Sequence, residues 1–445
     1  MTEINETNKH STTMDQWNPE DVDQWEASGK PLAWRTLWIT TFCLILSFTT
    51  WFMVSAMVVK LSGIGFKFET QQLFWLTAMP GLAAGTLRII HTFLIPIFGT
   101  RKTITASTIL LLIPALGWGF AVMNPATSYT TFLILAFLAG LGGGNFSSFM
   151  PSTSLFFPKK KQGTALGIQA GIGNFGVSLV QFLTPAMLGL ALYGGSQTFD
   201  DKNRTVEIHL QNAAFIWVPF IIIGAIAAWF GLKSVPVKAN FKQQLDIFKN
   251  RDTWLMTSLY VMTFGSFSGF AAAFPTMIGK MFGGFENAPE PLKFAFLGPL
   301  IGAAVRALAG PVCDKVGGGK VTTFAALGLV GCTFAGTAFT NPTSMAAWPG
   351  FLGCMLGIFF FSGVGNASTF KQMPMIFPPR QAGGVIGWTS AIAAYGPFLF
   401  AVPIGTLIAK QGHPTMFFMI AGCFFVINLF INYWFYARKN APTPC

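Results

Sequence analysis

The chain has 445 residues, of which 52% are hydrophobic and only 10% are charged, and its mean hydropathy is +0.55. This balance excludes an ordinary soluble domain and is typical of a protein that crosses a membrane several times. The net charge of +12 does not indicate nucleic-acid binding, because the basic residues are scattered through short connectors such as "TRKT" and "KKKQG" rather than gathered on a soluble domain.

Apolar segments follow one another along the chain after a polar, acid-rich tail. A window of about 19 residues predicts six membrane helices before a polar connector and six after it. The segments lie near 36–59, 71–98, 103–123, 130–157, 164–193 and 211–232, and then near 254–282, 292–313, 321–339, 346–377, 383–409 and 414–437. We therefore predict an all-α membrane protein with twelve transmembrane helices in two pseudo-symmetric six-helix bundles. The expected parts are a tail 1–34, a bundle 35–232, a linker 233–252, a bundle 253–437 and a tail 438–445.

Lysine and arginine are distributed unequally between the two sets of connectors. If the N-terminus is cytoplasmic, the inside connectors and tails carry about 18 of them and the outside connectors about seven. This asymmetry predicts a multi-pass protein of the cytoplasmic (inner) membrane with both termini in the cytoplasm. The non-membrane segments are too short to bury a catalytic core, so an enzyme is not expected.

The six cysteines have no spacing typical of metal ligands, and all but Cys445 lie in apolar runs. We interpret them as packing residues rather than as ligands or disulfides. No metal and no cofactor is expected.

The two halves of the chain resemble one another at corresponding places. "LAAGTLRIIHTFLIPIFGTRK" aligns with "LIGAAVRALAGPVCDKVGGGK" in one register, which sets Arg88 on Arg306 and Gly99 on Gly317. "GGNFSSF" aligns with "VGNASTF" in the same way, which sets Asn145 on Asn366. Each match is weak in a glycine-rich chain, but together they predict two similar bundles around a central site.

Arg88 and Arg306 stand in the middle of apolar segments. A charge there costs roughly 2.5–3.5 kcal/mol on insertion scales, so it normally faces a cavity and has a partner. Every Asp and Glu lies in a tail, in a connector or near the end of a segment. We therefore predict that the two arginines bind an anion that comes from outside the chain. The alternative is that each arginine binds backbone carbonyls or extends to an interface.

Small residues recur at intervals of four in "GTALGIQAGIGNFG" and "GGVIGWTSAIAAYG". This spacing predicts close packing of helices, and surfaces of this kind permit one bundle to rock on the other. The glycines concerned are Gly163, Gly167, Gly171, Gly173, Gly176, Gly383 and Gly387. Asn174 adds an amide to the first stretch. Phe146, Tyr260 and Phe264 are candidates to wall a planar substrate, although a ring in a chain with 48 Phe is more often core.

Several longer motifs run nearly from end to end: "WNPEDVDQW", "TLWIT", "PIFGTRK", "FFPKKKQGTALGIQAGIGNFGVS", "TFGSFSGF" and "GPLIGAAVRALAGPVCDKVGG". With them the chain resembles the bacterial nitrate/nitrite porters of the major facilitator superfamily. The resemblance implies the major facilitator fold and transport of nitrate and nitrite. It further implies that the arginines hold the anion, that the amide and the phenol donate hydrogen bonds, and that two rings enclose the anion. The residues in these roles are Arg88 and Arg306, Asn174 and Tyr260, and Phe146 and Phe264.

The second half departs from the pattern at the place equivalent to Asn174. "AIAAYG" stands there, without an asparagine, and Ser390 is the candidate that supplies a hydroxyl instead.

The mode of transport has two candidate answers. Proton symport needs a titratable group, and the membrane segments offer only His91, one turn from Arg88. Exchange of nitrate for nitrite needs no titratable group, so we expect exchange, with His91 as a packing residue. Proton-linked uptake is the alternative.

Other classes of protein fit the sequence less well. An organic-phosphate exchanger would need additional His or Lys residues in the cavity, and Lys371 is the one candidate. A channel would conduct without counter-transport, and a sensor would carry a soluble output domain. The expected partners are nitrate, nitrite and the lipid bilayer, with no nucleic acid and a monomeric chain.

Overall fold

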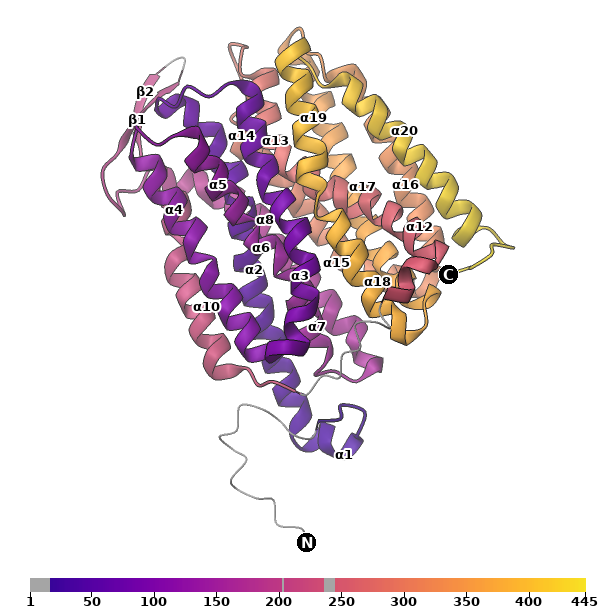
Figure 1. Ribbon diagram of the computed structural model, residues 1–445. Helices are drawn as coiled ribbons and strands as arrows, with labels where there is room; N and C mark the ends of the chain where they lie inside the picture. The colour runs from indigo at the N-terminus through magenta and orange to yellow at the C-terminus, as the bar shows by residue number, and fades with distance from the viewer. Residues whose placement is uncertain (1–16, 202–203, 236–244) are drawn as a thin grey trace.

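The computed structural model describes residues 17–201, 204–235 and 245–445, and these are almost entirely helical. Figure 1 shows the helices of the first half, indigo to magenta, gathered on one side and those of the second half, orange to yellow, on the other. The predicted tail 1–34 and linker 233–252 lie partly outside the described residues.

The elements of the first half are mainly long helices. They are α1 (Val22–Gln24), the π-helical turn Trp25–Gly29, α2 (Lys30–Leu61), the 3-10 turn Ser62–Ile64, α3 (Thr70–Leu110), α4 (Leu112–Met123), α5 (Tyr129–Ala139), α6 (Leu141–Gly144), α7 (Phe146–Ser154), α8 (Lys159–Leu188), β1 (Gln197–Asp201), β2 (Arg204–Ile208), α9 (Asn212–Phe215) and α10 (Trp217–Gly231).

The second half has a similar sequence of elements, without strands among its described residues. They are the 3-10 turn Leu245–Lys249, α12 (Arg251–Tyr260), the π-helical turn Val261–Gly265, α13 (Ser266–Phe282), α14 (Pro291–Ala295), α15 (Leu297–Val316), α16 (Gly318–Gly336), the 3-10 turns Thr337–Phe339 and Met345–Ala347, α17 (Trp348–Ile376), α18 (Pro379–Ala393), α19 (Gly396–Gln411), α20 (Thr415–Asn432) and the π-helical turn Tyr433–Ala437.

Eleven helical stretches of the described chain are apolar and long enough to cross a membrane. The second, Thr70–Met123, has 54 residues and would extend about 80 Å as one helix, far beyond a hydrocarbon core of about 30 Å. The chain turns back within it at Gly99, whose φ of 76° and ψ of 166° are not helical. The stretch makes two crossings, which confirms the predicted total of twelve.

The same turn recurs at the matching place of the second half. Gly317, which the sequence aligns with Gly99, has φ 98° and ψ 140° between α15 and α16. Positive φ of this size favours glycine because a Cβ would clash with the backbone. A Cβ on Gly99 would also stand 2.6 Å from Oγ of Ser234. The two bundles therefore resemble one another in the conformation of this turn as well as in their number of helices.

Polar residues start several helices by accepting hydrogen bonds from free backbone N–H groups. Glu69 and Gln72 form a capping box at the start of α3. The Ser128 hydroxyl accepts from the Thr131 N–H at the start of α5, and the Asn250 side chain accepts from the Asp252 N–H at the start of α12. These caps fix the helix starts that the apolar pattern alone leaves vague.

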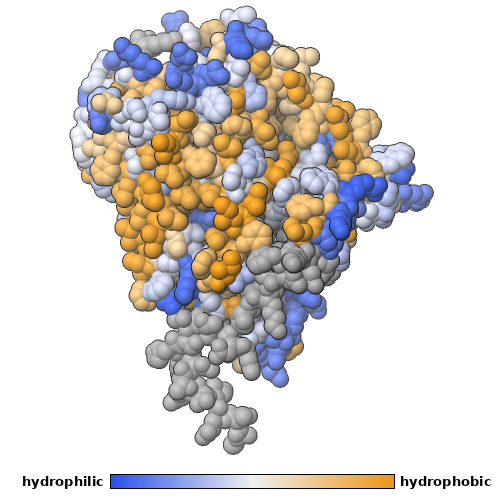
Figure 2. Space-filling model, viewed as in Figure 1, coloured by the Kyte–Doolittle hydropathy of each residue, from blue (hydrophilic) through white to orange (hydrophobic). Residues whose placement is uncertain are grey.

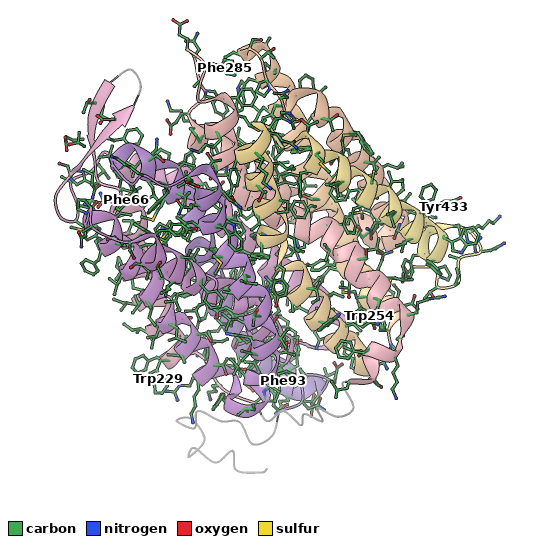
Figure 3. All side chains as sticks on the ribbon, turned by 45° about the horizontal axis from the view of Figure 1, so that its top comes forward. Phe66, Phe93, Trp229, Trp254, Phe285 and Tyr433 are labelled. Atoms are coloured by element: carbon green, nitrogen blue, oxygen red, sulfur yellow. The ribbon has the colours of Figure 1, made fainter. Side chains whose placement is uncertain are left out.

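The outer surface is suited to a bilayer. Figure 2 shows hydrophobic side chains over the middle of one face and hydrophilic ones gathered toward its ends. Trp229, Trp254 and Tyr433 lie at the periphery in Figure 3 and are 42%, 51% and 52% exposed. All three lie near helix ends at the same end of the bundles, where Trp and Tyr prefer the membrane–water interface. The chain is a multi-pass membrane protein.

The two ends of the molecule differ. One end carries α1 and the C-terminal end of the last helix, and we call it the tail side; the other carries the antiparallel pair β1 and β2, and we call it the hairpin side (Figure 1). The hairpin is not among the predicted elements, because it lies in a connector that hydropathy does not describe. Phe199 of β1 packs so closely on the end of α2 that a Cβ on Gly63 would stand 2.1 Å from its ring.

The two halves touch closely on the hairpin side. A Cβ on Gly85 would stand 2.5 Å from the Tyr395 ring, and one on Gly405 would stand 2.3 Å from Cβ of Phe74. Nζ of Lys60 lies 2.6 Å from Oε1 of Glu290, an ion pair that joins the end of α2 to the start of α14. The structure is therefore closed between its halves on this side.

Candidate functional site

Arg88 lies in α3 and is completely buried. Its Nε donates to the carbonyl of Gly143 at 2.8 Å, and its Nη1 donates to the carbonyl of Ser390, in the other half, at 2.7 Å. Its Nη2 is buried without a hydrogen-bond partner. The sequence left open that Arg88 binds backbone carbonyls instead of an anion. Nε and Nη1 do bind carbonyls, while Nη2 keeps its donors free.

Arg306 lies in α15, is 6% exposed, and has a buried Nη1 without a partner. The ion pairs of the described chain join Lys60 to Glu290 and Lys371 to Asp314, so neither arginine has a carboxylate within ion-pair distance there. Neither guanidinium faces lipid, and each retains a donor that an anion could use.

Aromatic rings surround the Arg88 guanidinium. Its Cζ lies 4.7 Å from the ring centroid of Phe146, 5.2 Å from that of Phe264 and 5.5 Å from that of Trp51. Phe146 comes from the first half and Phe264 from the second. A cation at this distance is stabilised by the negative face of a ring, which partly offsets its desolvation in the absence of a counter-ion.

A second group of rings connects this cluster with Arg306. Tyr260 and Phe264 are stacked, with centroids 5.5 Å apart and an interplanar angle of 10°. The π-helical turn Val261–Gly265 follows Tyr260 directly and carries Phe264, and such turns are frequent at functional sites. The Phe370 ring lies 6.1 Å from that of Tyr260 and 5.7 Å from the Arg306 Cζ.

Several polar groups near these rings are buried without partners. They include both amide atoms of Asn174, the hydroxyls of Tyr260, Ser390 and Ser147, and both amide atoms of Asn366. A buried polar group without a partner costs about 1–3 kcal/mol, and a few such groups per hundred residues are usual. Ser390 accepts from Arg88 through its carbonyl and Tyr260 stacks on Phe264, so these two unpartnered hydroxyls belong to the Arg88 surroundings, as is typical of a site that a polar ligand completes.

The α8 helix brings Asn174 toward Arg306. A Cβ on Gly171, one turn earlier, would lie 3.4 Å from Cβ of Ala307, which follows Arg306. The structure thus brings together Arg88, Phe146, Phe264, Tyr260 and Ser390 through a hydrogen bond and ring contacts, and places Asn174 on a helix that packs against the Arg306 helix.

A cavity of about 130 Å³ lies between the halves beside these rings. Phe146 and Ser147 line it from the first half, and Phe370, Gly387 and Ser390 line it from the second. Its walls are mostly apolar, and this volume exceeds the ~30 Å³ that one water occupies in the liquid. The cavity has room for a small anion next to Phe146 and Phe370, the rings that lie against the Arg88 and Arg306 guanidinium groups.

The glycines of the two small-residue stretches behave in two ways. Close packing is found at Gly173 and Gly176, where a Cβ would stand 2.7 Å from Leu44 and 2.4 Å from the Ile45 carbonyl. The others named as packing residues make ordinary contacts or none: Gly171 and Gly387 have neighbours at 3.4 Å or more, while Gly163, Gly167 and Gly383 have nothing within 4 Å.

The difference follows the position of each glycine in its helix. The three open glycines lie near the start of α8 and of α18, on the tail side, and Gly383 lines the cavity between the halves. Gly163, Gly167 and Gly383 make no close helix contact in this conformation, so a packing role for them stays a prediction. A gating role for the glycines stays a prediction.

His91 and Lys371 both have partners outside the ring cluster. Nδ1 of His91 lies 2.9 Å from the Ser148 hydroxyl, within the first half. Lys371 forms an ion pair with Asp314. This geometry favours packing roles for both side chains over a role in a central cavity.

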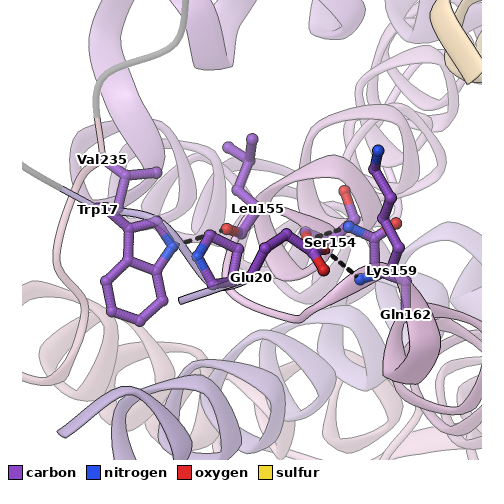
Figure 4. Close-up of a pocket in the computed structure, with 8 residues that line it drawn as sticks. Trp17, Glu20, Ser154, Leu155, Lys159, Gln162 and Val235 are labelled. Atoms are coloured by element: carbon purple, nitrogen blue, oxygen red, sulfur yellow. Dashed lines mark hydrogen bonds between the residues drawn. The ribbon is translucent and has the colours of Figure 1, made fainter. Parts of the chain in front are cut away.

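A larger cavity, of about 290 Å³, lies on the tail side, away from the arginines. Figure 4 shows it between the N-terminal segment and the α7–α8 connection, where the Trp17 indole donates to the Leu155 carbonyl at 2.9 Å. The Glu20 carboxylate accepts from the Lys159 N–H at 2.7 Å. Several of its polar groups are thus used within the chain, and none of the predicted site residues lines it.

Sequence reasoning missed Trp51, Ser147, Asn366 and Phe370. Trp51 is one of 13 Trp, and nothing in its local sequence distinguishes it. The other three belong to the aligned pair "GGNFSSF" and "VGNASTF", so the internal repeat did contain their signal.

Comparisons with known proteins agree with this architecture. The model of the Major Facilitator Superfamily matches residues 37–373. A protein named "Probable nitrate/nitrite antiporter NarK2" from Thermus thermophilus is 60% identical over 439 residues, which cover 98% of each chain. This chain belongs to the nitrate/nitrite porters of the major facilitator superfamily. "Nitrate/nitrite transporter NarU" of Salmonella typhimurium is 37% identical, with 99% of each chain covered.

The solved structures show the same fold. A bacterial homologue of the human lysosomal transporter Spinster, in an inward-facing and unoccupied conformation, superposes with a TM-score of 0.63 at 15% identity, over 91% of this chain and 97% of that one. The predicted fold is confirmed, and so is the prediction of a membrane transporter rather than an enzyme.

Proposed function

We propose that this protein exchanges nitrate for nitrite by alternating access across the cytoplasmic membrane, with both termini in the cytoplasm. The observation that carries the proposal is the pair of buried guanidinium groups, one from each half, that keep free donors and have no carboxylate partner among the described residues. The names of the relatives, which include a nitrate/nitrite antiporter, point to the same substrates. Arg88, Arg306, Asn174, Tyr260 and Ser390 would bind the anion, with Phe146 and Phe264 on either side of it.

Electrostatics makes such a site favour the filled state. At an effective dielectric of about 20, an anion about 4 Å from each of two cations gains about 4 kcal/mol per pair, against a repulsion of about 2 kcal/mol between cations about 8 Å apart. Dehydration removes part of the gain, least for weakly hydrated monovalent anions. A trigonal oxyanion also fits the planar fork of guanidinium, which donates two parallel hydrogen bonds.

Close contacts between the halves on the hairpin side, and open space beside Gly163, Gly167 and Gly383 on the tail side, support one state of an alternating-access cycle. If both termini are cytoplasmic, this conformation exposes the cavity to the cytoplasm. The empty site keeps two unneutralised cations, so reorientation without an anion is unfavourable, and this links outward movement of one anion to inward movement of another.

The alternatives have less support. Proton-linked uptake would rely on His91, whose Nδ1 is already engaged with Ser148. An organic-phosphate exchanger would use Lys371, which is paired with Asp314.

Flux into proteoliposomes tests the proposal. Vesicles loaded with nitrite should take up external nitrate with or without a proton gradient, and vesicles without internal anion should take up little. Uptake that needs the proton gradient and ignores internal nitrite would establish symport instead. Rapid conductance without counter-transport would establish a channel.

A further inference from the structure

Asn366 lies in α17 and is completely buried, with neither Nδ2 nor Oδ1 hydrogen-bonded. Its counterpart in the repeat is Asn145, whose Nδ2 donates to the Ser47 hydroxyl at 2.9 Å. The first-half asparagine thus has a structural partner and the second-half one has none. An amide offers two donors and an acceptor, so leaving all of them unused in a protein interior is costly unless a ligand uses them.

The packing of α15 against α17 places Asn366 at the level of Arg306. A Cβ on Gly363 would stand 2.4 Å from the Gly302 carbonyl, so these two glycines mark the closest approach. Both helices run from the hairpin side to the tail side. Arg306 follows Gly302 by four residues and Asn366 follows Gly363 by three, which at about 1.5 Å per residue differ by only about 1.5 Å along the axes.

Asn366 shares a face of α17 with Phe370, whose ring reaches both the cavity and Arg306. Phe370 lies one turn further on the same face, about 40° around the helix. Its ring lines the cavity of about 130 Å³ between the halves and stands 5.7 Å from the Arg306 Cζ. Asn366, one turn before Phe370, is completely buried and does not itself line this cavity, so it lies deeper on the same face, toward Arg306.

We propose that Asn366 is a second amide that binds the transported oxyanion, with Nδ2 donating to an anion oxygen beside Nη1 of Arg306. This inference rests on the proposed function and adds a residue to its site. Each half then supplies one guanidinium and one amide: Arg88 with Asn174, and Arg306 with Asn366. The α18 stretch "AIAAYG" has no asparagine at the Asn174-equivalent place, and α17 supplies the amide instead. Asn366 is thus a residue of the second half that helps to position a planar anion.

Anion binding to the purified full-length protein tests this role with matched variants. Asn366→Leu keeps the size and removes the amide, and we expect the Kd for nitrate to rise about ten- to hundredfold. Without nitrate, its melting temperature should be unchanged or higher, because a buried unpartnered amide is gone. At a fixed nitrate concentration, the increase in melting temperature that nitrate causes should shrink accordingly.

Asn428→Leu is the control, because Asn428 is an equally buried asparagine of the second half whose amide atoms both have partners. Its Nδ2 donates to the Phe424 carbonyl at 2.9 Å, and its Oδ1 accepts from the Ser258 hydroxyl at 2.8 Å. We expect a lower melting temperature and an unchanged Kd for nitrate. Asn366→Asp, nearly identical in shape, serves if the leucine variant does not fold; its carboxylate beside Arg306 should abolish nitrate binding at neutral pH.

The outcomes separate the two proposals. Wild-type affinity in both Asn366 variants, or an equal loss of affinity in Asn366→Leu and Asn428→Leu, would overturn the role of Asn366 and leave the proposed function intact. A wild-type protein that binds neither nitrate nor nitrite would overturn the proposed function itself. Initial exchange rates should show the effect of Asn366→Leu mainly in KM, as expected for a group that holds the anion in its bound state.

Discussion

Replacing Arg88 or Arg306 by lysine keeps the charge and changes only the geometry of donation. The Arg88 guanidinium uses Nε on the Gly143 carbonyl and Nη1 on the Ser390 carbonyl, which leaves Nη2 for a ligand. A lysine has one ammonium at the end of a flexible stem. It cannot serve two carbonyls and an anion from the positions that a planar fork occupies.

The magnitude follows from what is lost. The Coulomb attraction of about 4 kcal/mol per cation remains largely intact, because the charge remains. One charge-assisted hydrogen bond to the anion is lost or distorted, and such bonds contribute about 1.5–3 kcal/mol. We therefore expect Arg88→Lys and Arg306→Lys each to raise the Kd for nitrate about ten- to hundredfold. Arg88→Lys should also lower the melting temperature, because a carbonyl of Gly143 or Ser390 loses its donor.

The assay is nitrate binding to the purified protein, followed by nitrate/nitrite exchange in proteoliposomes. Arg101→Lys is the control: Arg101 also donates from Nε to a backbone carbonyl, that of Trp229 at 2.6 Å, and its Cζ lies 4.0 Å from that ring, but it is on the tail side. Arg101→Lys should bind and exchange as wild type. Near-normal affinity in both Arg88→Lys and Arg306→Lys would refute the assignment of the site to the guanidinium forks.

Three further predictions concern single side chains. Tyr260→Phe removes a buried hydroxyl without a partner, so the melting temperature should stay while the nitrate Kd rises about fivefold or more, measured by calorimetry. Gly405→Ala puts a Cβ 2.3 Å from that of Phe74 and should separate the hairpin side, seen as a longer distance between spin labels at Gln71 and Thr406; an unchanged distance would contradict the close packing. His91→Gln should leave exchange intact in nitrite-loaded vesicles, and loss of a proton-driven component on this change would favour symport.

The sequence predicts the membrane helices well because lipid imposes a simple rule on them. The segment 292–313 corresponds to α14 and α15, Pro291–Val316, and the segment 346–377 to Met345–Ile376. The rule fails where helices leave the lipid. The first helical stretch begins at Val22 rather than near 36, because the Trp25 ring packs on Phe157 of the α7–α8 connection, 5.9 Å between centroids, and so stabilises a polar segment.

Site residues could be predicted from the sequence where placing the side chain in a membrane costs much free energy. Arg88 and Arg306 are expensive in a membrane, and the position of every acid is visible in the sequence. Trp51 could not be predicted in this way, since a ring carries no such cost and only the folded chain brings it beneath a guanidinium, and for Phe370 the internal repeat was the one signal. Asn366 lies between these cases. The free-energy cost of burying its amide depends on whether the amide has a hydrogen-bond partner, and only the folded structure shows that it has none.

The Arg88–Ser390 hydrogen bond gives the proposed exchange a structural link between substrate and conformation. Arg88 belongs to the first half and Ser390 to the second, so their bond at 2.7 Å joins the halves at the level of the site. An anion that engages the free Nη2 of Arg88 and the free Nη1 of Arg306 would add a second bridge at the same level. Because the hairpin side is already closed, this bridge would pull together the halves at the tail side, where Gly163, Gly167 and Gly383 have open space in front of them. Binding energy would thus be directed to the side that must close next, and an empty site would supply no such force.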